Sequence, residues 1–493
     1  PGNQILLKEK ALLWDLSTST AAATEPFATR GVADYTVVQA EEGKPNGTFL
    51  LAKPADNANY KANVEMFAKS FDGNRNKAYA TWQYFGSPVK NADRNQLPLE
   101  TTWVRKYDRT LNVPNSDEKW TDVDNGTLAQ GQGYEISQPK PATYRFIGEL
   151  NTADFTFPVD GMASATNYQD MNILANPYTG AMSIDKLDFS GAAAADKVVY
   201  LFNTGSRKDW IANSGPTTNG TTQGQYTKAI PANLAGHVAG MPNQIPSLSS
   251  FMVKSTAAGN LKYRYADLVT ATEENRAPQR HFHSLAVDVE SAKTADRLWL
   301  VQAEGTTDRY DNGWDGEKIF APGEAALYAM QDRSYQVTTT DAIGETKVGF
   351  VPGDGEQNYK LTFHLDGGDG TQQYTLLDKR TGLTRAIHDG DTYEFTATKG
   401  DAAHRFTILG NGAKATADQR GFQISADLRR NFTVKNFTDQ PAEALVFDAA
   451  GKIQARFTVE PGSENTGTVV MPGAYVVRVS NKVTTLTQRF VMP

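Results

Sequence analysis

The sequence contains no cysteine among its 493 residues. Disulfide bonds, thiolate catalysis and metal or haem sites built on cysteine are therefore excluded. The compartment stays open, because exported bacterial proteins often fold without disulfides. No stretch approaches the ~20 consecutive apolar residues that a membrane-spanning helix needs.

Basic clusters and common catalytic motifs are also missing. Lys and Arg number 49 against 56 Asp and Glu, so the formal net charge is −7. Nucleic acids and anionic membranes require a basic face, so neither partner is favoured. No Gly-x-Ser-x-Gly elbow occurs, and Gly131-Gln132-Gly133 is followed by no Lys-Ser/Thr pair, so we expect a tight turn there. An enzyme whose site has no sequence motif is left as a third option.

Short strands form the dominant pattern. Segments rich in Val, Tyr, Phe and Thr alternate with clusters of Gly, Asn, Asp and Pro. The segment 359–365 shows the two-residue alternation of a half-buried strand. Because the chain is longer than one core usually serves, the sequence predicts an all-β fold of several tandem β-sandwich domains, Ig-like or jelly-roll-like.

An internal repeat supports this organisation. The first copy begins at Trp82-Gln83-Tyr84-Phe85 and continues to Gly131-Gln132-Gly133-Tyr134. The second begins at Met171-Asn172-Ile173-Leu174 and continues to Ser249-Ser250-Phe251. Matched positions of a duplicated sandwich are most often core positions. We therefore expect four tryptophans of the repeat in the core: Trp82, Trp103, Trp120 and Trp210.

Composition and pattern divide the chain into six parts. They are an N-terminal β segment without an assigned pattern (1–78), two repeat lobes (79–157 and 158–278), a β-sandwich (279–410), a small, polar linker (411–421) and a C-terminal Ig-like module (422–493). The chain starts with Pro1-Gly2-Asn3-Gln4, without Met and without a basic-then-apolar signal. We interpret this start as a processed or excised N-terminus.

One acidic turn is the best candidate for a metal site. A flexible loop that supplies several oxygen ligands suits Ca²⁺. The candidate ligands are Asp308, Asp311, Asn312 and Asp315. Their order differs from that of known calcium loops, so we favour an acidic β-turn pinned by Trp314. No other cofactor is expected.

Two further features have both a functional and a structural interpretation. His281 and His283 would share one face of a strand and could bind a metal, but no third ligand is near in sequence, so structural histidines are favoured. Trp314 lies in a polar turn outside the repeat, where an exposed ring could stack on a sugar or on a neighbouring protein.

Several motifs together resemble those of a known group of proteins. The segment 172–178, which contains Asn-Pro-Tyr, resembles a module of large surface proteins of the Bacteroidetes, and 280–329 resembles the module that follows it. The segments 447–452 and 472–477 resemble the C-terminal sorting domain of type IX secretion substrates. The resemblance implies four sorting positions: Gly451, Gly473, Tyr475 and Arg489. Family members commonly end in a Lys-rich strand, whereas only Arg489 is basic in the last six residues here.

The resemblance implies a non-catalytic protein at the cell surface, associated with the outer membrane. It would be exported by the type IX machinery and act in adhesion or as a structural component. Its partners would be other surface proteins, glycans or its own copies, docked on edge strands. The alternative is a carbohydrate-binding portion of a secreted hydrolase whose catalytic domain precedes Pro1.

Overall fold

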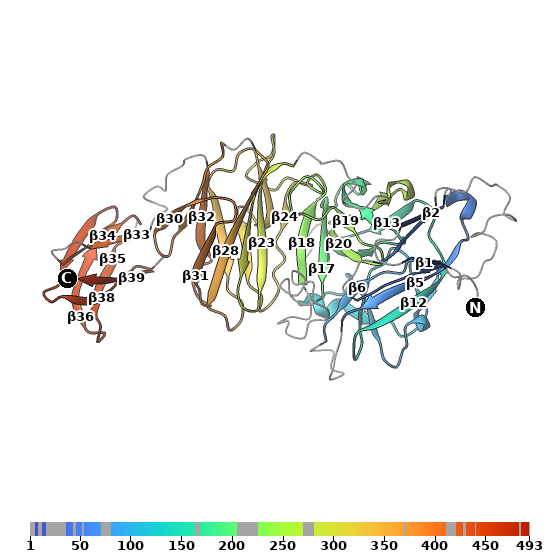
Figure 1. Cartoon of the computed structure of the whole chain (residues 1–493), viewed down its shortest axis with the longest axis horizontal. Coiled ribbons are helices and arrows are strands. Elements are labelled where there is room, and N and C mark those ends of the chain that lie inside the picture. Colours follow the sequence, from blue (N-terminus) through green and yellow to red (C-terminus); the bar gives the residue numbers. More distant parts are fainter. Residues whose placement is uncertain are drawn as a thin grey trace.

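The computed structural model is built almost entirely of β-strands (Figure 1). It describes residues 5–7, 12–15, 36–42, 46–51, 54–70, 80–162, 168–204, 225–269, 281–368, 371–410, 421–426, 430–438, 440–482 and 485–492. These ranges contain no α-helix; the short 3₁₀ turns are η1 (Pro54–Asn57), η3 (Arg94–Gln96), η4 (Ser116–Lys119), η5 (Ile184–Lys186) and η6 (Tyr265–Asp267). The predicted all-β class with several sandwiches is confirmed.

The first lobe packs two main sheets around one core. One has the order β1 (Ile5–Leu7), β3 (Thr36–Val38), β5 (Lys61–Ala68) and β12 (Ala142–Glu149). The other has the order β6 (Gln83–Phe85), β11 (Tyr134–Ser137), β8 (Trp103–Tyr107) and β9 (Trp120–Asp122). Two minor pairs are β2 (Leu12–Asp15) with β4 (Thr48–Leu51), and β7 (Ala92–Asp93) with β10 (Thr127–Leu128). Because Val64, Phe85 and Phe146 share this core, the strands on either side of residue 78 form one unit.

The second lobe repeats one sheet of the first. Its larger sheet has the order β14 (Met171–Ala175), β20 (Ser250–Lys254), β17 (Val198–Asn203) and β18 (Gln225–Pro231). The sheet β6-β11-β8-β9 of the first lobe has the same order: β14 corresponds to β6, β20 to β11, β17 to β8 and β18 to β9. The other strands are β13 (Phe155–Val159), β21 (Gly259–Tyr263) and β16 (Asp188–Gly191) in one sheet, and β15 (Met182–Ser183) paired with β19 (Gln244–Ile245). The repeat found in the sequence is therefore also a repeat of topology.

The two lobes contact each other through equivalent segments. Gly86 donates its N–H to the Leu248 carbonyl at 2.9 Å, and Ala175 donates to the Gly131 carbonyl at the same distance. Gly86 and Ala175 are counterparts in the repeat, as are Gly131 and Leu248. Since each copy gives the other the same bond, the lobes are related by a local two-fold axis.

Three of the four tryptophans of the repeat belong to the described residues. Trp82 is fully buried, whereas Trp103 and Trp120 are half-buried. Trp120 packs on Tyr84 and Tyr107 against the second lobe. Trp210 lies outside the described residues.

One sheet of eleven strands forms the third part of the chain. In spatial order it contains β30 (Leu383–Ile387), β29 (Tyr374–Asp378), β32 (His404–Gly410), β27 (Thr346–Val351), β25 (Ala326–Met330), β26 (Ser334–Thr340), β23 (Ala295–Gln302), β22 (His283–Glu290), β28 (Asn358–Asp366) and β31 (Thr392–Thr396), with β24 (Gly316–Glu317) on β26. The sheet folds around its own core, and Trp299 and Val337 on its other face share a core with the second lobe. The lobes and this sandwich therefore form one continuously packed body.

The terminal module has a separate core. Its two sheets are β33 (Phe422–Ala426), β34 (Asn431–Asn436) and β37 (Glu464–Thr468), and β36 (Ile453–Val459), β35 (Ala442–Asp448), β38 (Gly473–Ser480) and β39 (Thr485–Met492). Phe432, Val446 and Val477 are fully buried between them. The module lies at one end of the elongated molecule, next to the sandwich (Figure 1). None of the apolar clusters found in the described ranges joins the two.

Candidate functional site

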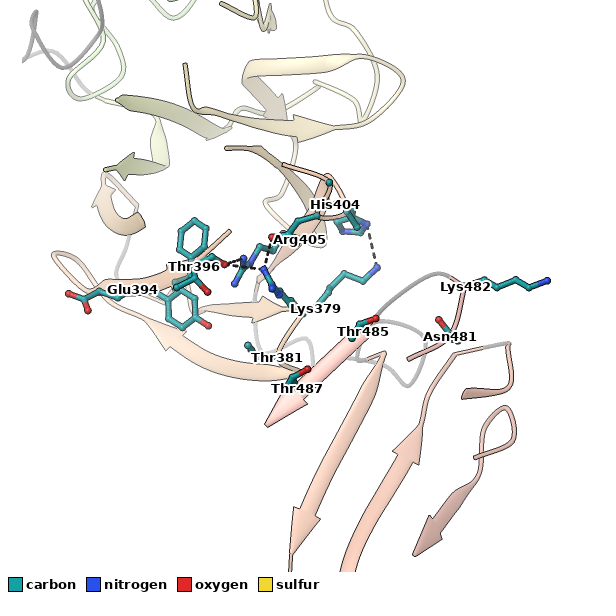
Figure 2. Close-up of a pocket in the computed structure, with 16 residues that line it drawn as sticks. Lys379, Thr381, Glu394, Thr396, His404, Arg405, Asn481, Lys482, Thr485 and Thr487 are labelled. Carbon is teal, nitrogen blue, oxygen red and sulfur yellow. Dashed lines mark hydrogen bonds and ion pairs between the residues drawn. The ribbon is translucent and has the colours of Figure 1, made fainter. Parts of the chain in front are cut away.

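A cavity lies at the junction between the sandwich and the terminal module. Its volume is about 890 Å³, and residues of both parts line it (Figure 2). The sandwich contributes polar residues from the turn after β29, from β31 and from the start of β32, among them Lys379, Arg380, Glu394, His404 and Arg405. The module contributes Asn481, Lys482, Thr485 and Thr487.

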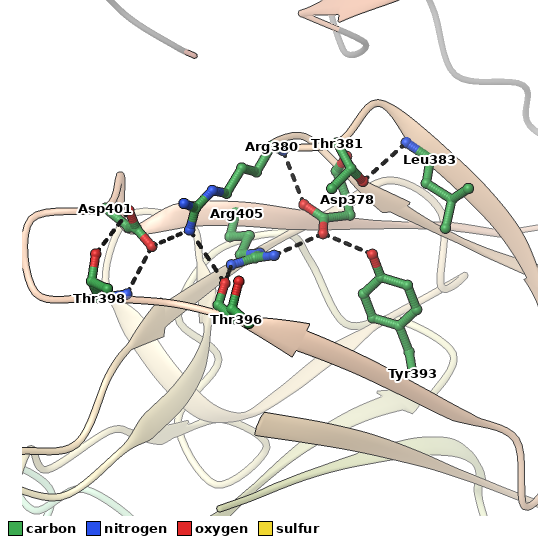
Figure 3. A network of polar contacts seen from close by, with 9 residues as sticks. All are labelled: Asp378, Arg380, Thr381, Leu383, Tyr393, Thr396, Thr398, Asp401 and Arg405. Atoms are coloured by element: carbon green, nitrogen blue, oxygen red, sulfur yellow. Dashed lines mark hydrogen bonds and ion pairs between the residues drawn. The ribbon is translucent and has the colours of Figure 1, made fainter. Parts of the chain in front are cut away.

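A buried carboxylate fixes the sandwich wall of this cleft (Figure 3). Asp378 is fully buried and accepts hydrogen bonds from Arg405 Nη2 and from the Tyr393 hydroxyl, both at 2.9 Å. Its second oxygen accepts the backbone N–H of Arg380 at 2.9 Å. Burial raises the pKa of Tyr393 to about 12, so its hydroxyl stays protonated and can donate. These bonds hold the turn after β29 in one place.

Arginine side chains bridge the gap between the two end strands of the sheet. β30 and β31 are the ends of the strand order and do not pair with each other. Instead, Arg385 donates to the Thr392 carbonyl at 2.9 Å. Arg380 and Arg405 both donate to the Thr396 carbonyl. The carbonyl groups of Thr392 and Thr396 at the two ends of β31 thus have hydrogen-bond donors without a neighbouring strand.

Lys379 and His404 form a basic pair in the cleft. Lys379 Nζ lies 3.4 Å from His404 Nδ1 (Figure 2). Burial, with Lys379 and Lys347 nearby, lowers the pKa of His404 to about 4, so this imidazole is neutral at pH 7. Burial and Lys347 also lower the pKa of Lys379. Arg380 and Arg405 pair with Asp401 and Asp378, whereas Lys379 forms no such ion pair within the described part of the chain.

The four sorting positions lie in the terminal module, in different local settings. Gly451 closes the turn between β35 and β36 with a φ of +78°, a conformation that favours glycine. Gly473 starts β38. Tyr475 is buried against Phe432 and donates its hydroxyl to the Met471 carbonyl at 2.6 Å. Arg489 lies exposed on β39. A sorting role for these residues stays a prediction.

The acidic turn is held together by its own hydrogen bonds. Asp315 is fully buried and accepts the N–H groups of Asp311 and Thr339, both at 2.7 Å. Burial raises the pKa of Asp315 to about 7. Asp311 accepts the N–H of Thr307 at 2.6 Å, and Asp308 accepts the Thr340 hydroxyl at 3.0 Å.

The remaining candidate ligand, Asn312, contacts the second lobe. It accepts the N–H of Lys197 at 2.7 Å and donates to the Ala195 carbonyl at 3.1 Å. The turn therefore links the sandwich to the second lobe. Calcium binding at the acidic turn stays a prediction, which thermal unfolding with and without added Ca²⁺ would test.

His281 and His283 lie just before and at the start of β22, and each contacts a different side chain. His281 Nδ1 lies 2.7 Å from an Asp366 carboxylate oxygen, and His283 Nε2 lies 2.5 Å from the Tyr374 hydroxyl. No cluster of three or more His, Asp or Glu side chains that could hold a metal ion occurs in the ranges that the structure describes. Trp314 is half-buried and packs edge-on against Phe282, with ring centres 5.7 Å apart.

The sequence contains no signal for the cleft and almost none for the Asp378 network. Asp378, Tyr393 and Arg405 come from three strands, and no spacing in the sequence relates them. The only local signal was the alternation in β31, which turns Tyr393 and Phe395 inward. The junction with the module depends on the path of the chain between two domains, which the sequence does not indicate.

Comparison with known proteins places the chain in a family. It belongs to the family described as domain of unknown function DUF8693, which matches residues 44–409. It is also 30% identical over 481 residues to the Minor fimbrium subunit Mfa5 of Porphyromonas gingivalis. The matched region is 92% of this chain and 38% of that protein, so the chain spans well under half of this relative's length.

Two solved structures were also compared with the chain. A chain described as "Biofilm associated protein - BSP domain" has a TM-score of 0.13 and 9% identity, with 85% of this chain and 96% of the other covered. An Escherichia coli alpha-2-macroglobulin has a TM-score of 0.11 and 10% identity, with 83% and 40% covered. At these scores neither likeness bears on fold or function. In the described ranges, no helix is long and apolar enough to cross a membrane.

Proposed function

We propose that this protein is a non-catalytic subunit of an adhesive or fimbria-like structure on the cell surface. The observation that carries the proposal is the 30% identity to a minor fimbrium subunit along 92% of the chain. Such a subunit works by presenting surfaces and bearing load rather than by chemistry.

The packing of the chain supports a mechanical role. The first lobe bonds to the second through paired backbone contacts, and the second lobe shares an apolar core with the sandwich. A stiff body suits a protein that holds binding surfaces away from the cell. Immunogold labelling of intact cells, together with purification of sheared surface appendages, tests the assignment. The protein should copurify with the appendages, and recovery only as free monomer in the medium would argue against it.

We also propose type IX export directed by the terminal module. The support is the resemblance of 447–452 and 472–477 to sorting domains, in a module with its own core. Deletion of residues 422–493 should leave the protein in the periplasm, detected by fractionation and surface proteolysis. The truncated protein must be shown to be folded, because unfolded protein would be degraded instead. Normal surface display of the folded truncation would refute the export role.

The carbohydrate-binding alternative has less support. Its candidate ring, Trp314, is half-buried against Phe282 instead of standing free in solvent. Glycan-array binding that Trp314→Ala abolishes without loss of folding would favour this alternative.

A further inference from the structure

The cleft described above is the place where two separately packed parts of the molecule meet. The sandwich and the terminal module each enclose their own core, and polar residues line the space of about 890 Å³ between them. Binding sites occur preferentially at such domain boundaries, because the concave surface needs no hole in either core.

The charge of the cleft is opposite to that of the chain. The whole sequence has a net charge of −7. Four basic side chains line the cleft: Lys379, Arg380, Arg405 and Lys482. Two acidic side chains, Glu394 and Asp401, line it as well. Two of the cations are engaged, because Arg380 pairs with Asp401 and Arg405 with Asp378. Of the other two, Lys482 points away from the rest of the lining, whereas Lys379 lies inside the cleft beside the neutral His404 and can receive an anionic group there (Figure 2).

The walls of the cleft suit an extended peptide better than a sugar. The aromatic rings that line it, Tyr393 and Phe395, are at most 9% exposed and offer no face for stacking. The wall that belongs to the terminal module instead contains β39, an end strand of its sheet. On the opposite wall, arginine side chains already occupy the Thr392 and Thr396 carbonyls of β31. End strands accept extended peptides through backbone hydrogen bonds, and hydroxyls such as those of Thr485 and Thr487 add donors.

We infer that this cleft binds an extended segment of a partner protein rich in Asp and Glu, with a carboxylate of that segment paired to Lys379. The contact would be a charge-assisted hydrogen bond in a partly buried place, which is stronger than an exposed ion pair. The lowered pKa of Lys379, caused by burial and by Lys347, agrees with a cation that gains from an added carboxylate. The inference does not depend on the export route or on the kind of surface structure.

Fluorescence anisotropy with the full chain tests this site. The probe is a labelled peptide in which Asp alternates with Val, and its partner probe has Asn in place of every Asp. The Asp peptide should bind, and more weakly as salt is added, because the pairing is electrostatic. Lys379→Gln should weaken binding about tenfold or more, whereas Lys379→Arg should retain most of it.

Two further variants distinguish binding in the cleft from a general effect of lost charge or lost folding. Lys435→Gln removes the same charge from β34, where Lys435 pairs with Glu464 and does not line the cleft, and should leave binding unchanged. Thr487→Val removes only a hydroxyl from the opposite wall and should weaken binding in a folded protein. Concentration-dependent self-association that Lys379→Gln abolishes would support the site and identify the partner as a second copy.

Three results would overturn the inference. They are equal binding of the Asp and Asn peptides, equal effects of Lys379→Gln and Lys435→Gln, and preferential binding of oligosaccharides that contain uronic or sialic acid. The last result would assign the cleft to an anionic glycan instead of a peptide.

Discussion

Gly86 and Ala175 occupy equivalent positions in the two lobes and lie directly against each other. A Cβ atom on Gly86 would be 2.1 Å from the Cβ of Ala175, which is far inside van der Waals contact. The local two-fold axis therefore passes between these residues, and only one of them can carry a methyl group. A symmetric ancestor with alanine at both positions could not pack in this way.

This relationship predicts the outcome of exchanging the two residues. Gly86→Ala should destabilise the protein by about 1–3 kcal/mol, because the added methyl forces the lobes apart. Ala175→Gly alone should cost about 0.5–1 kcal/mol through chain entropy. The double variant should have nearly the same free energy of unfolding as Ala175→Gly. Once the Ala175 methyl is gone, the nearest atoms to the new Cβ at position 86 are 3.5 Å away or more. Urea unfolding of all four proteins measures the coupling; strictly additive effects would contradict the packing described.

The Asp378–Arg405 pair predicts a large difference between two arginines of the cleft. Arg405 and Asp378 are buried, so Arg405→Gln should leave an uncompensated carboxylate and cost about 3–5 kcal/mol. Arg380 forms a partly exposed pair with Asp401, so Arg380→Gln should cost only about 0–1 kcal/mol. Chemical unfolding compares them directly. Equal losses would mean that the Asp378 network does not hold the wall of the cleft.

The buried Asp315 predicts a stability that falls as the pH rises. Burial raises its pKa in the folded protein to about 7, while an unfolded Asp titrates near ~3.9. Between these values the folded state holds a proton that the unfolded state has released, so folding weakens with increasing pH and levels off above about 7. The cost should not exceed about 4 kcal/mol, since a tenfold change in proton affinity corresponds to about 1.4 kcal/mol.

Asp315→Asn isolates this contribution. The amide cannot ionise, so the decrease in unfolding free energy between pH 5 and pH 8 should be smaller in the variant than in the parent protein. The variant should be less stable at pH 5, because one of the two N–H groups of Asp311 and Thr339 loses its acceptor. Parallel pH profiles would show that Asp315 titrates normally or that the turn opens.

The sequence indicated the all-β class and the repeat because both depend on local patterns. The alternation in 359–365 reappears in β28, and Phe85 and Leu174 occupy matching strands. It did not indicate that Lys61–Ala68 pairs with Ala142–Glu149, because no short-range signal identifies partners so far apart in the chain. The burial of Trp314 was not indicated for the same reason, because it depends on contact with Phe282, a residue distant in the sequence.

The separate core of the terminal module predicts two unfolding transitions. Deleting residues 422–493 should remove one transition and shift the other by no more than about 2 °C, because no shared apolar core is lost. Val477→Ala should lower only the module's stability, by about 1–3 kcal/mol, since Val477 is fully buried there. Val287→Ala in the sandwich core is the matched control and should affect only the other transition. A single calorimetric transition that both substitutions shift would mean that the cleft couples the two parts tightly, and the cleft would then have little freedom to open for a ligand.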